Sequence, residues 1–131
     1  MELSGKRLLL VEDNAINMEI AHAILEEEHL NITEAKNGKE AVEIFQNSKS
    51  NEYDVIIMDV MMPVMDGLEA TKAIRMLERE DAKKIPIIAM TANAFEEDRK
   101  ACLDAGMNEH IGKPIDIPLL KRTITKAIGD R

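Results

Sequence analysis

The sequence has very few aromatic residues: its 131 residues include no Trp, one Tyr and two Phe. A core built from this chain must therefore be aliphatic, with the nine Met as adaptable filler among Ile, Leu, Val and Ala. Basic residues are also scarce, since 17 Lys and Arg stand against 25 Asp and Glu, for a net charge of −8. Such a chain repels phosphate backbones and anionic membranes, so we expect no nucleic-acid binding and no direct membrane contact.

Cysteine and long apolar runs are scarce as well. The one cysteine, Cys102, excludes an internal disulfide and fits a reducing compartment. No signal peptide is recognisable at the start, and no apolar run approaches the roughly 20 residues that span a bilayer. We therefore expect a cytoplasmic, monomeric protein, and 131 residues leave room for one compact domain.

Short apolar runs alternate with segments of helical spacing along the chain. Apolar runs of strand length occur at 8–11, 55–58 and 87–90, with weaker strand candidates at 31–35 and 110–112. Continuous apolar runs are typical of parallel strands that are covered on both faces.

Between the strands, apolar residues recur at the spacing of helix faces. The five faces are Ile16, Ile20, Ala23 and Ile24; Ala41, Val42 and Phe45; Ala70, Ala73, Ile74 and Leu77; Ala94, Asp98, Ala101, Cys102 and Ala105; and Leu120, Ile124, Ala127 and Ile128. The last helix is expected to begin after Asp116, a plausible N-cap. Five repeats of strand then helix predict an α/β fold, a doubly wound parallel sheet of five strands with five helices.

Polar residues follow the strands at their carboxyl ends, where ligands bind in open α/β sheets. Glu12 and Asp13 follow the first strand, Asp59 the third, Thr91 the fourth and Lys113 the fifth. Taken singly, each could be a loop charge, a turn residue or a helix cap, but their joint position favours a shared site. Three close carboxylates repel one another unless a cation lies among them. Because the donors are all oxygens, Mg²⁺ is the expected ion, and Mn²⁺ could replace it.

Other binding motifs are absent from the sequence or incomplete. Neither of the two familiar glycine-rich phosphate loops occurs. The stretch Asp59–Gly67 superficially resembles a calcium loop, but Met61 and Pro63 stand where oxygen ligands are needed.

Four blocks, in this order and spacing, resemble the receiver domain of response regulators in two-component phosphorelays. The blocks are Leu8–Asn14, Asp59–Gly67, Ile88–Ala92 and His110–Pro114. The residues at 11–14 with Asn17, and those at 90–94, are especially similar to receivers of hybrid sensor histidine kinases.

The resemblance implies a flavodoxin-like sheet of order 2-1-3-4-5 between two helical layers. It predicts a single receiver domain over 1–131, with a linker at 1–6 and the folded part at 7–129. The chain is then expected to act in the cytoplasm, either alone or as an excised part of a membrane-bound hybrid kinase.

The resemblance further implies that Asp59 accepts a phosphoryl group from the phosphohistidine of a histidine kinase or a histidine phosphotransfer domain. Asp13 and Asp59 would bind Mg²⁺ directly, the Met61 carbonyl would add a third oxygen, and Glu12 would act through a metal-bound water. Lys113 would pair with a phosphoryl oxygen. Such a domain catalyses its own phosphorylation and dephosphorylation, which requires charge neutralisation and in-line positioning.

The remaining implied roles concern the response to phosphorylation. Thr91 and the Ala92 amide would hydrogen-bond the phosphoryl group, and the peptide bond before Pro114 would be cis. His110 stands where the family usually has Tyr or Phe, the ring that moves inward as Thr91 moves. The surface of the fourth helix, fifth strand and fifth helix would then present the change to a downstream protein.

Three rival functions share parts of this pattern. A metal-dependent phosphatase or hydrolase of the haloacid-dehalogenase type would use Asp59 as nucleophile, but needs a second Asp where Met61 stands. A flavodoxin-like cofactor carrier needs a loop that binds phosphate after the first strand, where Glu12 and Asp13 would repel it. A receiver that signals by binding alone would not require Asp59, Thr91 and Lys113.

Overall fold

The computed structural model describes residues 3–62, 64–91, 96–112 and 116–129. Five parallel strands form one sheet in the predicted order, β2-β1-β3-β4-β5. They are β1 (Arg7–Val11), β2 (Asn31–Ala35), β3 (Val55–Asp59), β4 (Ile87–Thr91) and β5 (Glu109–Gly112). The three central strands are buried almost throughout, which agrees with their continuous apolar sequences.

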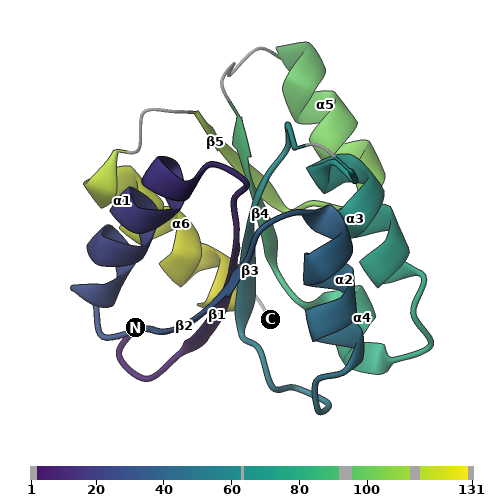
Figure 1. Cartoon of the computed structure of the whole chain (residues 1–131), viewed down its shortest axis with the longest axis horizontal. Helices are drawn as coiled ribbons and strands as arrows, with labels where there is room; N and C mark the ends of the chain where they lie inside the picture. The colour runs from purple at the N-terminus through teal and green to yellow at the C-terminus, as the bar shows by residue number, and fades with distance from the viewer. Residues whose placement is uncertain (1–2, 63, 92–95, 113–115, 130–131) are drawn as a thin grey trace.

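Helices cover both faces of the sheet, so the domain has three layers (Figure 1). On one face lie α1 (Ala15–Glu26) and α6 (Ile117–Gly129), and on the other α2 (Gly38–Gln46), α3 (Gly67–Arg75) and α5 (Glu96–Ala105). The sequence predicted five helices, whereas the described part of the chain contains six. The addition, α4 (Glu80–Lys84), has five residues and is too short to show an apolar period. No helix in the described ranges combines the length and the apolar character needed to cross a membrane.

Two clusters of buried aliphatic side chains hold the layers together. Alternate residues of each strand supply them: Leu9 and Val11 of β1 face the α2, α3 and α5 side, and Leu8 and Leu10 face α1 and α6.

The Asp116 carboxylate accepts a hydrogen bond from the Leu119 amide at 3.2 Å, as expected of the α6 N-cap.

Helix α1 packs on the sheet through a different face from the predicted one. Met18, Ala21 and Leu25 are its buried residues. Ile16 and Ile20, which the sequence analysis placed on the apolar stripe, are 68% and 51% exposed. Both sets have helical spacing, so periodicity alone could not choose between them. The structure therefore corrects the prediction and leaves an apolar surface, the isoleucine face (Ile16 and Ile20), turned to solvent.

A partly buried ion pair explains how the short helix α4 is held. The guanidinium of Arg79 donates to both carboxylate oxygens of Asp81, at 3.0 and 2.7 Å. It also donates to the Phe45 carbonyl at the end of α2, at 2.7 Å, and to the Ser48 carbonyl, at 3.1 Å. Asp81 in turn accepts the Asn51 amide at 2.9 Å. This network satisfies carbonyls that α2 leaves without intrahelical partners and ties α2 to α4.

A second arginine joins α3 to the connection between α5 and β5. Arg75 donates to the carbonyls of Gly106 and Ala82, at 2.8 and 3.0 Å, and to the Asn108 side chain, at 3.0 Å. The same Asn108 oxygen accepts the amide of Ile87 at 2.8 Å, where β4 begins. Arginine side chains therefore link several chain segments at the amino-terminal end of the sheet.

Asp81→Asn should lower the free energy of unfolding by about 2 kcal/mol at pH 7, because it weakens charge-assisted hydrogen bonds to Arg79. Burial acts to raise the pKa of Asp81, but the hydrogen bonds from Arg79, the backbone amides of Asn51 and Ala82 and the charge of Arg79 together outweigh it and hold that pKa below its ordinary value. The stabilisation is thus present above about pH 4 and lost as pH falls through the lowered pKa. Urea unfolding at pH 7 and pH 3 should show the difference from wild type shrinking at low pH.

Glu80→Gln provides the matched control, because it removes the neighbouring carboxylate from an exposed pair with Lys84. It should change stability little at either pH. Equal losses in the two variants would contradict the role given to the Arg79–Asp81 pair.

Candidate functional site

Three carboxylates meet at the carboxyl edge of the sheet, as the sequence predicted. Glu12 and Asp13 follow β1, and Asp59 is the last residue of β3. Because β1 pairs directly with β3, the two strand ends are adjacent. One oxygen from each side chain lies within 4.8 Å of the others. Glu12 and Asp59 are buried, whereas Asp13 is exposed at the mouth of this carboxylate cluster (Glu12, Asp13 and Asp59).

The start of α1 holds the part of the cluster that follows β1, Glu12 and Asp13. The side chain of Asn14 caps this helix by accepting the Asn17 amide at 2.9 Å. The Asn14 amide donates to the Glu12 carboxylate at 3.1 Å, and the Glu12 amide donates to the Ala35 carbonyl at the same distance. The cap is therefore Asn14, and neither Glu12 nor Asp13 is needed for that structural role.

The β3–α3 loop (residues 60–66) holds the third carboxylate, Asp59. The Met61 amide donates to Oδ1 of Asp59 at 3.2 Å, so the Met61 backbone lies against the carboxylate. The Gly67 amide bonds to the Val60 carbonyl at 2.9 Å, which folds the loop back on the strand. A Cβ on Gly67 would lie well under 3.0 Å from the Asp59 carbonyl oxygen, so only glycine permits this close approach.

The β3–α3 loop also contains a strained residue. Val64 has φ of 70° and is 78% exposed. A β-branched residue rarely occupies the left-handed region, where the cost is about 1–3 kcal/mol. The conformation therefore has to be imposed by contacts at the two ends of the loop.

The remaining predicted residues lie on the other two strands of this edge. Thr91 ends β4, is buried, and pairs in register with Gly112 of β5. Gly112 immediately precedes Lys113 in sequence, but Lys113, Ala92 and Pro114 lie outside the described residues. The structure therefore places Thr91 at the carboxyl edge and leaves those three predictions untested.

His110 shows a feature that the sequence could not reveal. It lies opposite Ala89 in the sheet and is partly buried. Its Nε2 atom is buried, and no hydrogen-bond partner for it occurs among the described residues. Leaving a polar atom in this state costs about 1–3 kcal/mol. The ring therefore turns a polar atom into the protein, at the strand that carries the predicted switch.

The carboxylate cluster fits a hard divalent cation. Its side chains offer only oxygen donors, and two of the three are buried where their repulsion is poorly screened. Mg²⁺ favours a few carboxylates together with waters and phosphate oxygens, and the Asp13 member of the cluster is exposed to solvent. The arrangement can thus gather positive charge around a buried carboxylate that ends a strand.

Comparison with known proteins agrees with this geometry. Residues 8–125 match the response regulator receiver domain family. The chain is 38% identical to hybrid signal transduction histidine kinase I of Dictyostelium discoideum over 98% of its own length, and 42% identical to kinase M of that organism over 95%. It spans only 8% and 5% of those two proteins.

Solved structures show the same likeness. The receiver domain of a Pseudomonas aeruginosa sensor histidine kinase, with magnesium coordinated in its active site cleft, is 40% identical, with a TM-score of 0.85 over 96% of this chain and 99% of that one. The receiver domain of yeast Ssk1, solved with the histidine phosphotransfer protein Ypd1, is 31% identical, with a TM-score of 0.82 over 95% and 89%.

These likenesses do not favour the hydrolase alternative, because the matching proteins are receivers and kinases that carry them. They agree with the strand order and with the carboxylate cluster at the edge of the sheet. The chain belongs to the response regulator receiver domain family and is a receiver domain of two-component phosphorelay signalling.

Proposed function

We propose that Asp59 accepts a phosphoryl group from the phosphohistidine of a histidine kinase or a histidine phosphotransfer protein. The observation that carries the proposal is the burial of Asp59 at the end of β3, within 4.8 Å of two other carboxylates. In the transfer, a carboxylate oxygen forms a bond to phosphorus while the phosphorus–nitrogen bond breaks and the donor imidazole leaves. The product is an acyl phosphate on the receiver.

The carboxylate cluster and the loop backbone would hold a metal ion for this step. Asp13 and Asp59 would bind Mg²⁺ directly, and the Met61 carbonyl would add an oxygen, since the Met61 amide already contacts Asp59. Glu12 would act through a metal-bound water. When bound, the ion supplies positive charge to the phosphoryl oxygens, and Mn²⁺ would suit the same oxygen donors.

Residues on β4 and after β5 would complete the site. Thr91, at the end of β4, would hydrogen-bond a phosphoryl oxygen together with the Ala92 amide. Lys113 would neutralise part of the added charge, and the Lys113–Pro114 bond would fix its direction. Phosphoryl transfer requires this kind of positioning and charge compensation, and little covalent chemistry from the protein.

The change on phosphorylation would be presented on the surface of α5, β5 and α6, which are the fourth helix, fifth strand and fifth helix of the sequence prediction. Thr91 leads into the segment before α5, and His110 lies on β5, next to β4. Movement of Thr91 toward the phosphoryl group would alter the packing of the His110 ring and shift the population between two arrangements. A downstream protein would bind one of them better.

The isoleucine face on α1 would be the docking surface for the phosphoryl donor. Helix α1 begins two residues after Asp13, so Ile16, its second residue, follows the carboxylate cluster closely in the chain. Exposed apolar side chains beside a polar site are typical of protein-binding surfaces. The complex of the related Ssk1 receiver with Ypd1 supports a phosphotransfer protein as the partner. The kinship with hybrid kinases supports a cytoplasmic location as part of such a protein.

Phosphorylation at Asp59 can be tested with acetyl phosphate and Mg²⁺. Intact-mass spectrometry should show the addition of one phosphoryl group to wild type and none to Asp59→Asn. Asp13→Asn keeps the acceptor but removes charge from the cluster, so it should react roughly tenfold more slowly or worse. Modification of Asp59→Asn at the wild-type rate would contradict the assignment.

Mg²⁺ should stabilise the folded chain by mass action, by about 2.7 kcal/mol at a concentration 100 times the dissociation constant. Thermal melts with Mg²⁺ and with excess chelator should therefore differ for wild type and converge for Asp13→Asn. Asp104→Asn, which removes the same charge from the exposed surface of α5, serves as the control and should behave as wild type. A wild-type melting temperature that ignores millimolar Mg²⁺ would refute the metal site.

Docking through α1 predicts a selective defect in Ile20→Ala. Loss of one aliphatic side chain that the complex would bury should slow transfer from phosphorylated Ypd1 by roughly tenfold, while the reaction with acetyl phosphate stays unchanged. Leu103→Ala, at an exposed apolar position of α5, is the control. Equal rates from Ypd1 for Ile20→Ala and wild type would show that the donor docks elsewhere.

A further inference from the structure

We propose that Gly38, the first residue of α2, is a positioning residue for the metal site and acts through the β3–α3 loop. The inference rests on the proposed Mg²⁺ site at the carboxylate cluster. Gly38 is not a member of that cluster and has no side chain that could bind a metal. Its effect would be to fix where the loop places the Met61 carbonyl beside Asp59.

The contact between α2 and the loop is made by backbone atoms. The Gly38 amide donates to the Met65 carbonyl at 3.1 Å. A Cβ added to Gly38 would lie well under 3.0 Å from that same oxygen, and 3.0 Å from both the Asp66 carbonyl oxygen and the Ala70 Cβ. Two of these three atoms are main-chain oxygens, so no change of side-chain rotamer can make room. An alanine at this position must displace either α2 or the loop.

Helix α2 is the better anchored of the two. Its N-cap, Asn37, accepts the Glu40 amide at 2.8 Å, and Ala41 and Phe45 are fully buried in the core. Its last turn is held by Arg79, which donates to the Phe45 carbonyl at 2.7 Å. Moving α2 would disturb all of these contacts, so the loop should yield.

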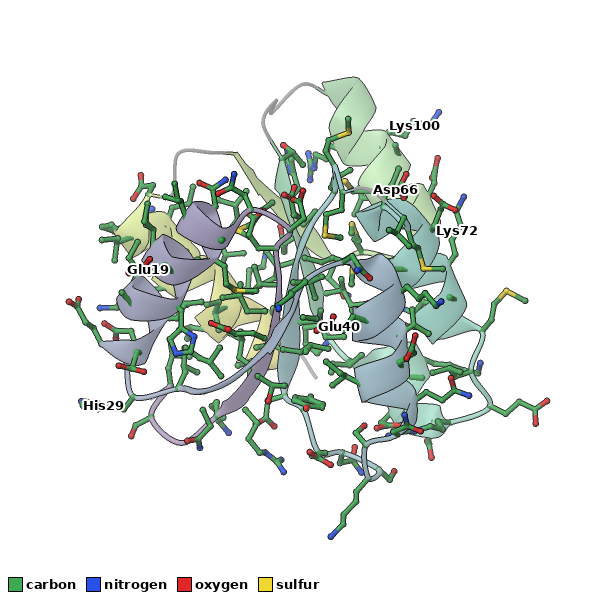
Figure 2. The ribbon with its side chains drawn as sticks, in the orientation of Figure 1. Glu19, His29, Glu40, Asp66, Lys72 and Lys100 are labelled. Atoms are coloured by element: carbon green, nitrogen blue, oxygen red, sulfur yellow. The ribbon has the colours of Figure 1, made fainter. Side chains whose placement is uncertain are left out.

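The loop can transmit such a displacement because hydrogen bonds couple its two ends to Asp59 and to α3. At one end the Met61 amide bonds to Asp59, and at the other Asp66 caps α3 by accepting the Glu69 amide at 2.8 Å. Figure 2 shows Asp66 at the end of α3 that lies toward the carboxyl edge of the sheet. Between these points Val64 is held in the left-handed region, with φ of 70°. The Gly67 amide, two residues after Met65, bonds to the Val60 carbonyl at 2.9 Å, and Gly67 lies against the Asp59 carbonyl, so a shift at Met65 and Asp66 reaches the residues at the end of β3.

The test compares Mg²⁺ affinity in wild type, Gly38→Ala and Gly106→Ala, by following amide chemical shifts near Asp13 and Asp59 during titration. Gly106 has φ of +111° and an added Cβ there would meet the Arg75 side chain at 3.0 Å, so this control is strained but affects the α5–β5 connection. Gly38→Ala should raise the dissociation constant about tenfold, whereas Gly106→Ala should stay within about twofold of wild type. Urea unfolding of both variants would measure their losses of stability, so that the two Mg²⁺ affinities are compared at a known difference in stability.

Asn37→Ala provides a second variant that adds no atom. It loosens the start of α2 by removing the hydrogen bond that the Asn37 side chain accepts from the Glu40 amide. The dissociation constant for Mg²⁺ should rise by about two- to threefold. It carries the test if Gly38→Ala does not fold. Wild-type affinity in every α2 variant that folds would overturn the inference, as would an equal loss in Gly106→Ala. A wild-type chain that binds no Mg²⁺ would overturn the proposed function and this inference together.

Discussion

The mutual repulsion of three carboxylates is the constraint on which the rest of this domain depends. Glu12, Asp13 and Asp59 present oxygens within 4.8 Å of one another, and two of the three are buried. Such proximity is unfavourable in the absence of a cation, so the surrounding structure must hold it in place. The repulsion therefore lowers the stability of the cation-free domain, and a bound cation would recover that free energy. The proposed Mg²⁺ ion would relieve this repulsion.

Rigid elements on either side of the cluster provide the necessary support. Strands β1 and β3 are direct neighbours in the sheet, which fixes the separation of their carboxyl ends. The cap at Asn14 and the folded-back loop before Gly67 then determine the direction of the side chains. Because these supports are mostly backbone hydrogen bonds and close backbone contacts, substitutions of their side chains would disturb them less than a change of a few atoms at a glycine.

The sequence was a good guide to the sheet and its carboxyl edge, and a poorer one to surfaces. Apolar runs and the polar residues behind them locate Asp13, Asp59 and Thr91, because strand ends in a parallel sheet meet by topology. The buried face of α1 was misassigned, since the residue set with Met18 and the set with Ile16 both have helical spacing and only tertiary packing selects one of them. Helix α4 was missed because the Arg79–Asp81 pair, and no apolar period, maintains it. The burial of His110 Nε2 with no hydrogen-bond partner among the described residues depends on ring orientation, which no sequence pattern encodes.

The two ends of the domain are built by different means. At the amino-terminal ends of the strands, Arg75 and Arg79 bind the carbonyls of several segments, and α4 lies next to α3 toward that end (Figure 1). At the carboxyl ends, function resides in loops and in side chains that repel one another. Stability and signalling are thus separated along the strand direction. Under the proposed function, substitutions at the carboxyl rim would change the response to phosphorylation, while the arginine contacts at the opposite rim would keep the domain folded.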